Sequence, residues 1–159
     1  MRLTMMTDYA MRLLMYVAQH PDRLCTIAEV ARAYGISEAH LMKVTHQLGL
    51  AGWIETVRGK GGGMRLAYPP EEINVGAVVR RMEPDFQMAE CFRDDSRCSL
   101  AGTCGLTGIL GEAVAAFLER LDRYTLHDLL PRLPDGTLVM IPDRPPAQTP
   151  ARAASPEKA

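Results

Sequence analysis

Two short helical segments joined by a tight turn constrain the fold of this chain more than any other feature. The first is predicted over residues 26–33, where Thr26 stands in the position of an N-cap. Gly35 provides the turn, because glycine adopts a positive φ without steric cost. Ser37 then caps a helix predicted over about 38–50. This order of helix, glycine turn and serine-capped helix is typical of a helix-turn-helix.

A β-hairpin is predicted directly after these helices. Residues 53–58 and 64–68 have the β-branched and alternating pattern of strands, and four glycines and Lys60 lie between them. Glycines allow a backbone to approach phosphates closely, and Arg58 and Lys60 add positive charge at the same place. The sequence therefore predicts a winged helix-turn-helix, with the hairpin as its wing.

Several other classes of protein are excluded or disfavoured. In a P-loop a Ser or Thr follows Gly-Lys, whereas Gly61 follows Lys60 here and a strand comes next. No apolar run reaches the roughly 20 residues that cross a bilayer, so no membrane span is expected. The N-terminal stretch carries Asp8 and Arg12 among its apolar residues and lacks a small-residue cleavage site. It is therefore predicted to be an amphipathic helix rather than a signal peptide, and the protein is expected to be cytoplasmic.

Two more helices are predicted to complete this domain. Residues 7–19 place apolar side chains at helical spacing, and Thr7 or Asp8 is the expected N-cap. Residues 74–83 form the second of these helices, with Asn74 as its N-cap.

A long helix is predicted from about residue 105 to residue 127. Its apolar residues recur every three or four positions, as in a coiled-coil stripe. They are Leu106, Leu110, Ala113, Phe117, Leu121 and Tyr124. A helix that projects from so small a domain has little of its own chain to pack against. We therefore expect it to pair with a second copy, which would present two recognition helices to a palindromic site.

The predicted organisation has four parts. Residues 1–83 form the winged helix-turn-helix domain, residues 84–104 a cysteine-rich loop, and residues 105–130 the dimerisation helix. Residues 131–159 are rich in Pro and Ala and are expected to be disordered from about residue 142. The expected fold class is therefore mainly α, with a small β-hairpin.

The net charge of −1 conceals an uneven distribution. Residues 1–68 carry 8 Lys or Arg and 5 Asp or Glu, whereas residues 69–130 carry 6 and 11. Residues 131–159 carry 4 and 3. A basic first part agrees with an anion-binding module, but many solvated surfaces carry a similar excess.

Three of the four cysteines lie close together, in the pattern Cys91-x6-Cys98-x5-Cys104. Cytosolic proteins rarely keep disulfides, so a metal or redox site is the favoured interpretation. Zinc sites usually contain a close C-x2-C pair, which is missing here, whereas iron–sulfur clusters accept irregular spacing. Three unligated thiols in a loop are the remaining alternative. Cys25 stands apart among apolar residues and is expected to be a small buried core residue.

Four stretches of the chain resemble the bacterial NsrR/IscR family of winged-helix regulators. They are MRLT-x3-DYA at the start, IAEVARAYGIS in the helix-turn-helix, VRGKGGGMRLA in the wing, and the C-x6-C-x5-C loop. The resemblance covers about residues 1–130. It implies a DNA-binding regulator that holds an iron–sulfur cluster in its cysteine loop.

The resemblance also implies which residues hold the cluster. IscR-like members bind a 2Fe–2S cluster and use a His shortly after the third Cys, but no His follows Cys104 before His127. The chain is more similar to the nitric-oxide-sensing members, and this similarity implies a 4Fe–4S cluster held by Cys91, Cys98 and Cys104. The implied fourth ligand is a carboxylate from the first helix of the partner subunit, which corresponds to Asp8. The residues alone leave both cluster types open, and Asp8 open as a helix cap.

We therefore expect a homodimeric transcriptional repressor whose affinity for a double-stranded DNA operator is set by an iron–sulfur cluster that nitric oxide destroys. The exposed start of the recognition helix would face the major groove, with Lys43 on phosphate or guanine. The wing would work from the minor groove. The predicted DNA-contacting residues are Ser37, Glu38, His40, Lys43, Arg58 and Lys60.

Three alternatives remain open. A regulator of iron supply or cluster assembly would respond to iron chelators rather than to nitric oxide. A winged helix that binds protein and holds zinc in its loop would be revealed by metal analysis. A metal-binding or redox enzyme is disfavoured, because the four histidines are scattered and none neighbours the clustered cysteines. They are His20, His40, His46 and His127.

Overall fold

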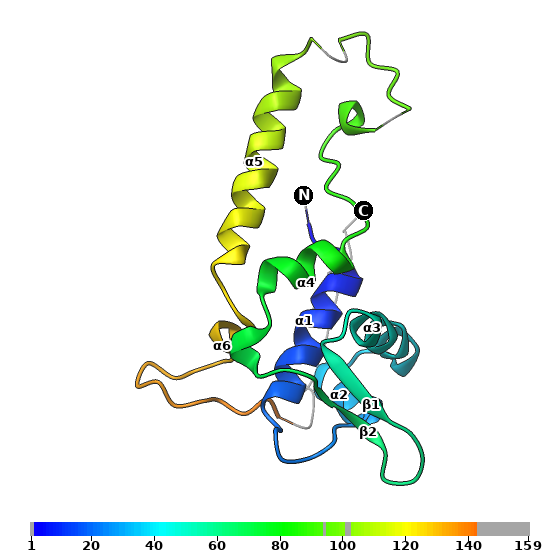
Figure 1. The fold of residues 1–159 in the computed structure, drawn as a ribbon, viewed down its shortest axis with the longest axis vertical. Helices are drawn as coiled ribbons and strands as arrows, with labels where there is room; N and C mark the ends of the chain where they lie inside the picture. Colours follow the sequence, from blue (N-terminus) through cyan, green and yellow to red (C-terminus); the bar gives the residue numbers. More distant parts are fainter. Residues whose placement is uncertain (1, 94, 101–102, 143–159) are drawn as a thin grey trace, which may run out of the picture.

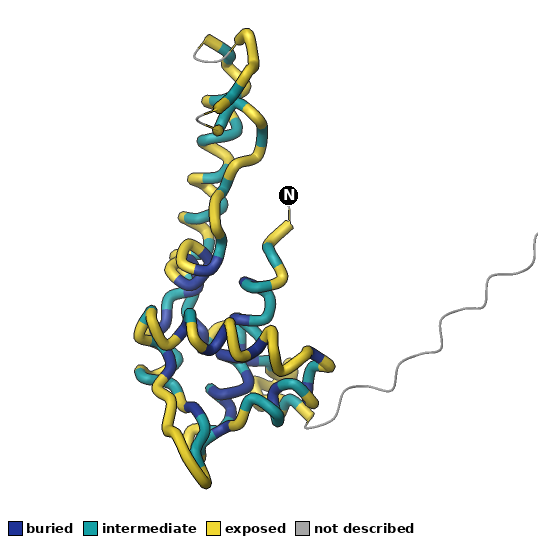
Figure 2. The backbone as a smooth tube through the Cα atoms, turned by 90° about the vertical axis from the view of Figure 1, so that its right-hand side faces the viewer, coloured by how far each residue is buried: buried dark blue, intermediate teal, exposed yellow. Residues whose placement is uncertain are grey.

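The computed structural model describes residues 2–93, 95–100 and 103–142. A helical body carries a long arm, formed by α5 and the loop before it (Figure 1). Buried residues gather in the body, whereas the described part of the arm is exposed or half-buried (Figure 2). None of the described helices is both long and apolar enough to cross a membrane. The elements in chain order are α1 (Met5–Ala18), α2 (Ile27–Tyr34), α3 (Glu38–Leu50), β1 (Ile54–Val57), β2 (Gly63–Leu66), η1 (Pro70–Glu72), α4 (Val75–Met82), η2 (Glu90–Phe92), α5 (Gly105–Asp122) and α6 (Leu126–Leu129).

Helix α1 forms the centre of the body. Its residues Ala10, Leu13 and Leu14 are fully buried. Helices α2, α3, α4 and α6 and strand β2 all contact it. The apolar face predicted for the first helix comprises Tyr9, Leu13, Tyr16 and Val17. It is confirmed, because Leu13, Tyr16 and Val17 are at most 1% exposed and Tyr9 is half-buried.

The N-cap predicted for α1 is wrong. Thr4 caps the helix rather than Thr7 or Asp8, and its side chain accepts the backbone N–H of Thr7 at 3.4 Å. Glu83 at the end of α4 holds Thr4 in place, because its Oε1 accepts the Thr4 N–H at 2.8 Å and the Thr4 hydroxyl at 3.1 Å. This partner lies 79 positions away in the sequence, so the local pattern does not reveal it.

The helix-turn-helix is confirmed. Thr26 and Glu29 form a capping box at the start of α2, and Gly35 ends that helix with a φ of 65°. Ser37 caps α3 by accepting the backbone N–H of His40. The two caps join residues three positions apart, and the turn at Gly35 is closed by bonds over at most five positions. All of these contacts are local, which explains why the sequence pattern predicts them correctly.

The wing is a two-stranded antiparallel hairpin in which Ile54 lies opposite Leu66. Its second strand also pairs with the connection between α1 and α2. There Cys25 and Met64 exchange two backbone hydrogen bonds, of 2.9 and 2.8 Å. Cys25 is fully buried, as expected. The base of the wing is therefore fixed to the body.

The long helix is shorter than predicted. Helix α5 ends at Asp122 instead of near residue 127, and Thr125 is the N-cap of the separate helix α6. The backbone N–H of Leu126 donates to the carbonyl of Ile73 at 2.8 Å, and the Leu126 side chain is 1% exposed. The chain turns back into the body at this point, so α6 belongs to the core rather than to the arm.

One residue near the end of α5 connects the arm to α4. Arg80 of α4 donates from both terminal nitrogens to the carboxylate of Asp122, one of them at 2.7 Å. Asn74, the N-cap of α4, donates to the Asp122 carbonyl at 2.7 Å. The Arg80 guanidinium lowers the pKa of the Asp122 carboxyl, because it stabilises the charged form.

The segment after α6 returns to the end of α1. Gln19 donates to the Val139 carbonyl at 2.7 Å and accepts the Ile141 N–H at 2.8 Å. Val139 and Ile141 therefore connect this segment to the body. The disordered tail was predicted from about residue 142, and residues 143–159 lie outside the described residues.

Gly76 of α4 packs tightly against Asp122 of α5, so a larger side chain at this position is expected to destabilise the protein. A Cβ at Gly76 would overlap the Asp122 carboxylate. Gly76→Ala should lower the free energy of unfolding by about 1–3 kcal/mol, because the carboxylate must move away from Arg80. Urea unfolding followed by circular dichroism measures this change.

Gly108→Ala is the matched control, since a Cβ at Gly108 meets no atom within 4 Å. It should stabilise α5 by roughly 0.5–1 kcal/mol, because alanine favours a helix over glycine. If Gly76→Ala stabilised the protein as well, the contact between Gly76 and Asp122 would not be tightly packed.

Candidate nucleic-acid interface and cysteine loop

The predicted contact residues of α3 lie on its exposed side. Ser37, Glu38, His40 and Lys43 are all exposed. The opposite side of the helix is buried in the body, through Leu41, Val44, Thr45 and Leu48. One face of α3 thus packs against the body. The other face is exposed to solvent and is accessible to a large ligand such as duplex DNA.

His40 differs from the other exposed residues of α3 because it already has two partners. Its Nδ1 lies 2.8 Å from the hydroxyl of Ser37. Its ring also faces Tyr9 of α1, with 6.0 Å between the ring centroids. The first turn of α3 is therefore in contact with α1.

The wing presents two exposed cations. Arg58 and Lys60 lie in the turn of the hairpin, between β1 and β2, and this turn projects from the body beyond α2 and α3 (Figure 1). Arg65 on β2 instead pairs with its cross-strand neighbour Glu55 at 2.8 Å. No ion pair occupies Arg58 or Lys60 within the described part of the chain, so both are available to an anionic partner.

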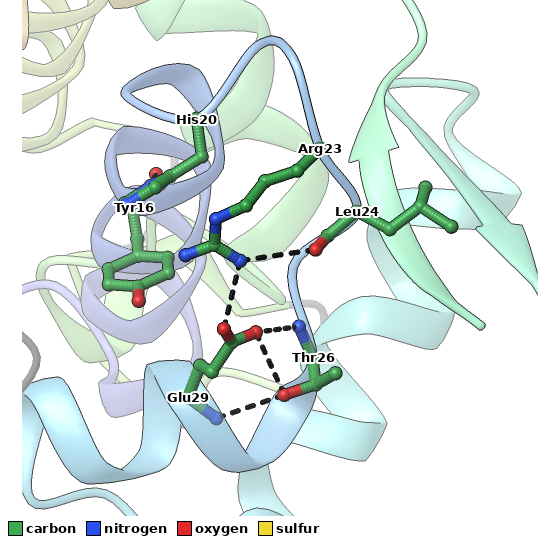
Figure 3. A network of polar contacts seen from close by, with 6 residues as sticks. All are labelled: Tyr16, His20, Arg23, Leu24, Thr26 and Glu29. Carbon is green, nitrogen blue, oxygen red and sulfur yellow. Dashed lines mark hydrogen bonds and ion pairs between the residues drawn. The ribbon is translucent and has the colours of Figure 1, made fainter. Parts of the chain in front are cut away.

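A polar network fixes the start of α2 (Figure 3). The Glu29 carboxylate accepts the backbone N–H of Thr26 at 2.6 Å and Arg23 Nη1 at 2.8 Å. Burial raises the pKa of the Glu29 carboxyl, but the hydrogen bonds from Thr26 and Arg23 outweigh burial and leave this pKa below its usual value. Arg23 also donates to the carbonyl of Leu24 at 3.1 Å. The start of α2 is thus joined to the connection that pairs with the wing.

Asp8 lies in the first turn of α1, with its side chain 46% exposed. Its carboxylate forms an ion pair of 2.9 Å with Arg12. It also lines an open groove of about 730 Å³, together with Arg2, Leu3, Thr4, Met5 and Met11. Asp8 is therefore accessible from outside the chain, but it has a cation as its partner.

Sequence reasoning missed the role of Arg12. Its spacing of four residues from Asp8 is the pattern that could have revealed the pair. The Arg12 guanidinium also lies 5.8 Å from the centre of the Tyr34 ring, at the end of α2. Burial raises the pKa of Tyr34 to about 12, although Arg12 opposes this shift. Arg12 thus connects the exposed Asp8 to the helix-turn-helix.

The three clustered cysteines belong to the loop that precedes α5, and this loop reaches the outer end of the arm (Figure 1). Cys91 is half-buried in η2, Cys98 is exposed, and Cys104 is half-buried at the N-cap of α5. All three are free thiols. No described residue between positions 84 and 122 is buried, so the loop has no core of its own.

The donors in this loop suit an iron–sulfur cluster chemically, because such clusters are held by cysteine thiolates. Cys104 begins α5, and the partial positive charge at a helix N-terminus favours anionic ligands there. Among the described residues, however, no three His, Cys, Asp or Glu side chains come close enough to hold a metal ion. The described part of a single chain therefore provides thiol donors without a formed site.

The apolar stripe predicted on α5 is only partly covered. Leu110, Phe117 and Leu121 are half-buried, whereas Leu106 is 53% exposed. Ile109, which the predicted stripe does not include, is 65% exposed. The outer half of α5 therefore presents large apolar side chains to solvent.

Comparison with known proteins agrees with this arrangement. The model of the Rrf2 family, described as an iron-dependent transcriptional regulator, matches residues 3–132. The HTH-type transcriptional regulator NsrR of Bacillus subtilis is 48% identical over 132 residues, which cover 82% of this chain and 90% of the relative. The NsrR protein of Halalkalibacterium halodurans is 50% identical over the same shares.

Solved structures show the same fold. The chain matches T. potens IscR with a TM-score of 0.65 at 24% identity, over 81% of this chain and 85% of that one. It matches CymR, the global cysteine regulator of B. subtilis, with a TM-score of 0.62 at 24% identity, over 81% and 95%. The expected winged-helix fold and the expectation of a regulator rather than an enzyme are thereby confirmed. The chain belongs to the Rrf2 family of DNA-binding transcriptional regulators.

Proposed function

We propose that this protein is a homodimeric transcriptional repressor whose affinity for double-stranded DNA depends on an iron–sulfur cluster that senses nitric oxide. The observation that carries the proposal is the division of the molecule into two parts. The helix-turn-helix, with one exposed face of α3, and the wing belong to the body, and three free thiols belong to the loop of the arm. Nitric oxide is proposed as the signal because the sequence resembles the nitric-oxide-sensing members of the family.

The exposed face of α3 would lie in the major groove, as the recognition helix does in helix-turn-helix proteins. Its first two turns would contact base edges and phosphates through Ser37, Glu38, His40 and Lys43. The wing would bring Arg58 and Lys60 to the minor groove, where the phosphates of both strands are close. Their exposure and the absence of ion pairs at Arg58 and Lys60 in the described structure support this role.

The exposed apolar surface of α5 supports a dimer. Leu106 and Ile109 are more than half exposed on a helix without a single buried residue. Burying such side chains against a second copy gains roughly 1.5–3 kcal/mol for each large one. A symmetric dimer would also place two recognition helices on one DNA site.

We propose that Cys91, Cys98 and Cys104 hold the cluster, and that Asp8 of the partner subunit completes the ligand set. The accessible carboxylate of Asp8 and the groove beside it support this assignment, because the groove leaves room for the loop of a second chain. A 4Fe–4S cluster, preferred here over 2Fe–2S, would supply iron atoms with which nitric oxide reacts.

The pair of Asp8 and Arg12 provides a way to link ligand binding to the DNA-binding surface. A carboxylate that coordinates a metal no longer faces Arg12 in the same way, and a released carboxylate can pair with it again at 2.9 Å. Because α1 packs against α3, the two states of Asp8 would favour different positions of the recognition helix.

A regulator of iron supply or cluster assembly is the second candidate. The description of the family as iron-dependent favours it. Iron chelators would then change DNA binding, whereas nitric oxide at concentrations that leave the iron in place would not. The same samples can be titrated with both reagents, which separates the two candidates.

The central experiment is an anaerobic nitric oxide titration of the purified protein. Iron, sulfide and the visible spectrum are recorded together with binding to a DNA duplex that the protein has selected from a random library. We expect about four irons per chain, as in a 4Fe–4S cluster, and bleaching of the spectrum in step with release of DNA. Zinc instead of iron, or binding that ignores nitric oxide, would contradict the proposal.

Cys98→Ala should abolish the iron content and the visible absorption, because it removes one thiolate ligand. Cys25→Ala is the matched control, since Cys25 is fully buried in the body and is not a proposed ligand. It should retain iron, provided that circular dichroism shows a folded protein. An unchanged spectrum in Cys98→Ala would remove Cys98 from the ligand set.

Asp8→Ala should retain part of the cluster but change its response to nitric oxide, because a carboxylate ligand is lost while the three thiolates remain. Titration of the visible spectrum measures the response. Asp22→Ala, which removes an exposed carboxylate after the other end of α1, should titrate like the wild type. Identical titrations for Asp8→Ala and the wild type would leave Asp8 only its ion pair with Arg12.

Arg58→Ala should weaken DNA binding and lower the slope of log K against log salt by about one, because one phosphate contact is lost. Fluorescence anisotropy at several salt concentrations measures both quantities. Arg123→Ala is the control, because Arg123 is exposed on the arm and pairs with Glu119 at 2.7 Å. Equal salt slopes for Arg58→Ala and Arg123→Ala would exclude Arg58 from the interface.

A further inference from the structure

Helices α1 and α3 meet at a pair of aromatic rings, and the contact between these rings has no part in the proposed function. The rings of Tyr9 and His40 have centroids 6.0 Å apart and planes inclined at 47°. Aromatic pairs attract one another at centroid separations of about 4.5–7 Å. Tyr9 is half-buried and packs against the hydrophobic core, so its position is fixed by the body of α1.

The other side of His40 faces the start of its own helix. Its Nδ1 lies 2.8 Å from the Ser37 hydroxyl, and the same hydroxyl accepts the backbone N–H of His40 at 3.4 Å. The imidazole therefore lies between α1 and the N-cap of the recognition helix. A change in the position of Tyr9 would therefore act on the exposed first turn of α3.

Tyr9 directly follows Asp8 in α1. Neighbouring residues of a helix project about 100° apart, and here they reach different surroundings. Asp8 pairs with Arg12 beside an open groove, whereas Tyr9 faces α3. Ala10, the next residue, is fully buried. One rigid turn of α1 therefore carries both the proposed ligand and the residue that contacts the recognition helix.

We propose that Tyr9 is a positioning residue that couples the state of Asp8 to the recognition helix by holding His40. This inference rests on the proposed function and adds the residues through which the signal passes. Arg12 reaches Tyr34 in α2, but Tyr9 contacts the residue of α3 that binds its own N-cap. Tyr9 thus acts on the orientation of α3 and does not itself contact DNA.

The test compares Tyr9→Leu, which removes the ring, with Tyr9→Phe, which retains it. For each full-length variant, affinity for a duplex selected by the wild type is measured with the cluster reconstituted and with the cluster removed. The readout is the dissociation constant of the cluster-free protein divided by that of the protein with its cluster. Tyr9→Leu should reduce this ratio by about two- to tenfold, which corresponds to the strength of an aromatic pair. Tyr9→Phe should retain the wild-type ratio.

A double-mutant cycle locates the coupling. His40→Gln is combined with Tyr9→Leu, and His40→Gln should reduce the ratio in the wild-type background but not in the Tyr9→Leu background. The His40 ring resonances of the cluster-free protein provide a second readout. They should shift in Tyr9→Leu and stay close to the wild type in Tyr9→Phe. Thermal unfolding shows whether Tyr9→Leu is folded; if it is not, Tyr9→Met takes its place.

The outcomes separate this inference from the proposed function. A wild-type ratio of one would overturn both, because no cluster signal would reach DNA. A wild-type ratio that Tyr9→Leu leaves unchanged would overturn the role of Tyr9 alone. Unchanged His40 resonances in Tyr9→Leu would show that the ring contact is not formed in solution, which also overturns the inference.

Discussion

Burial of α1 is the interaction on which the rest of the structure depends. Ala10, Leu13, Leu14 and Val17 are at most 1% exposed, and α3, α4, α6 and β2 pack around them. Full burial of one large aliphatic side chain contributes roughly 1.5–3 kcal/mol, so this single face has a large share in holding the body together. The first turn of the same helix reaches solvent at Asp8. A core helix thus carries a side chain that a second molecule can contact.

The arm, in contrast to α1, is not buried. Its loop and α5 bury no described residue from position 84 to position 122, and the bonds of Asp122 with Arg80 and Asn74 fix the base of α5 to α4. Helix α5 is fixed to the body at one end only, so its exposed apolar side chains are not buried within one chain. This incompleteness is the structural argument for a dimer and for cluster ligands drawn from two subunits.

Local sequence was sufficient for most of the fold. The caps at Thr26, Ser37 and Asn74 depend on residues three positions away, the turn at Gly35 depends on residues at most five positions away, and all were predicted correctly. The two errors have distant causes. The N-cap of α1 is Thr4, which is held by its hydrogen bond with Glu83. Helix α5 ends before the predicted position, and the chain turns back where Leu126 bonds Ile73. Neither partner can be identified from a window of neighbouring residues.

The sequence by itself determined the inventory of the candidate site: three thiols in one loop, exposed cations in a glycine-rich wing, and a serine-capped recognition helix. These features are local in the chain, so composition and spacing define them. Only the tertiary structure decided how the same residues are engaged. It showed that His40 faces Tyr9, and that the thiols of a single chain do not form a metal site among the described residues. A ring contact or a ligand set depends on distances between segments that are remote in sequence, and the packing of the folded chain sets those distances.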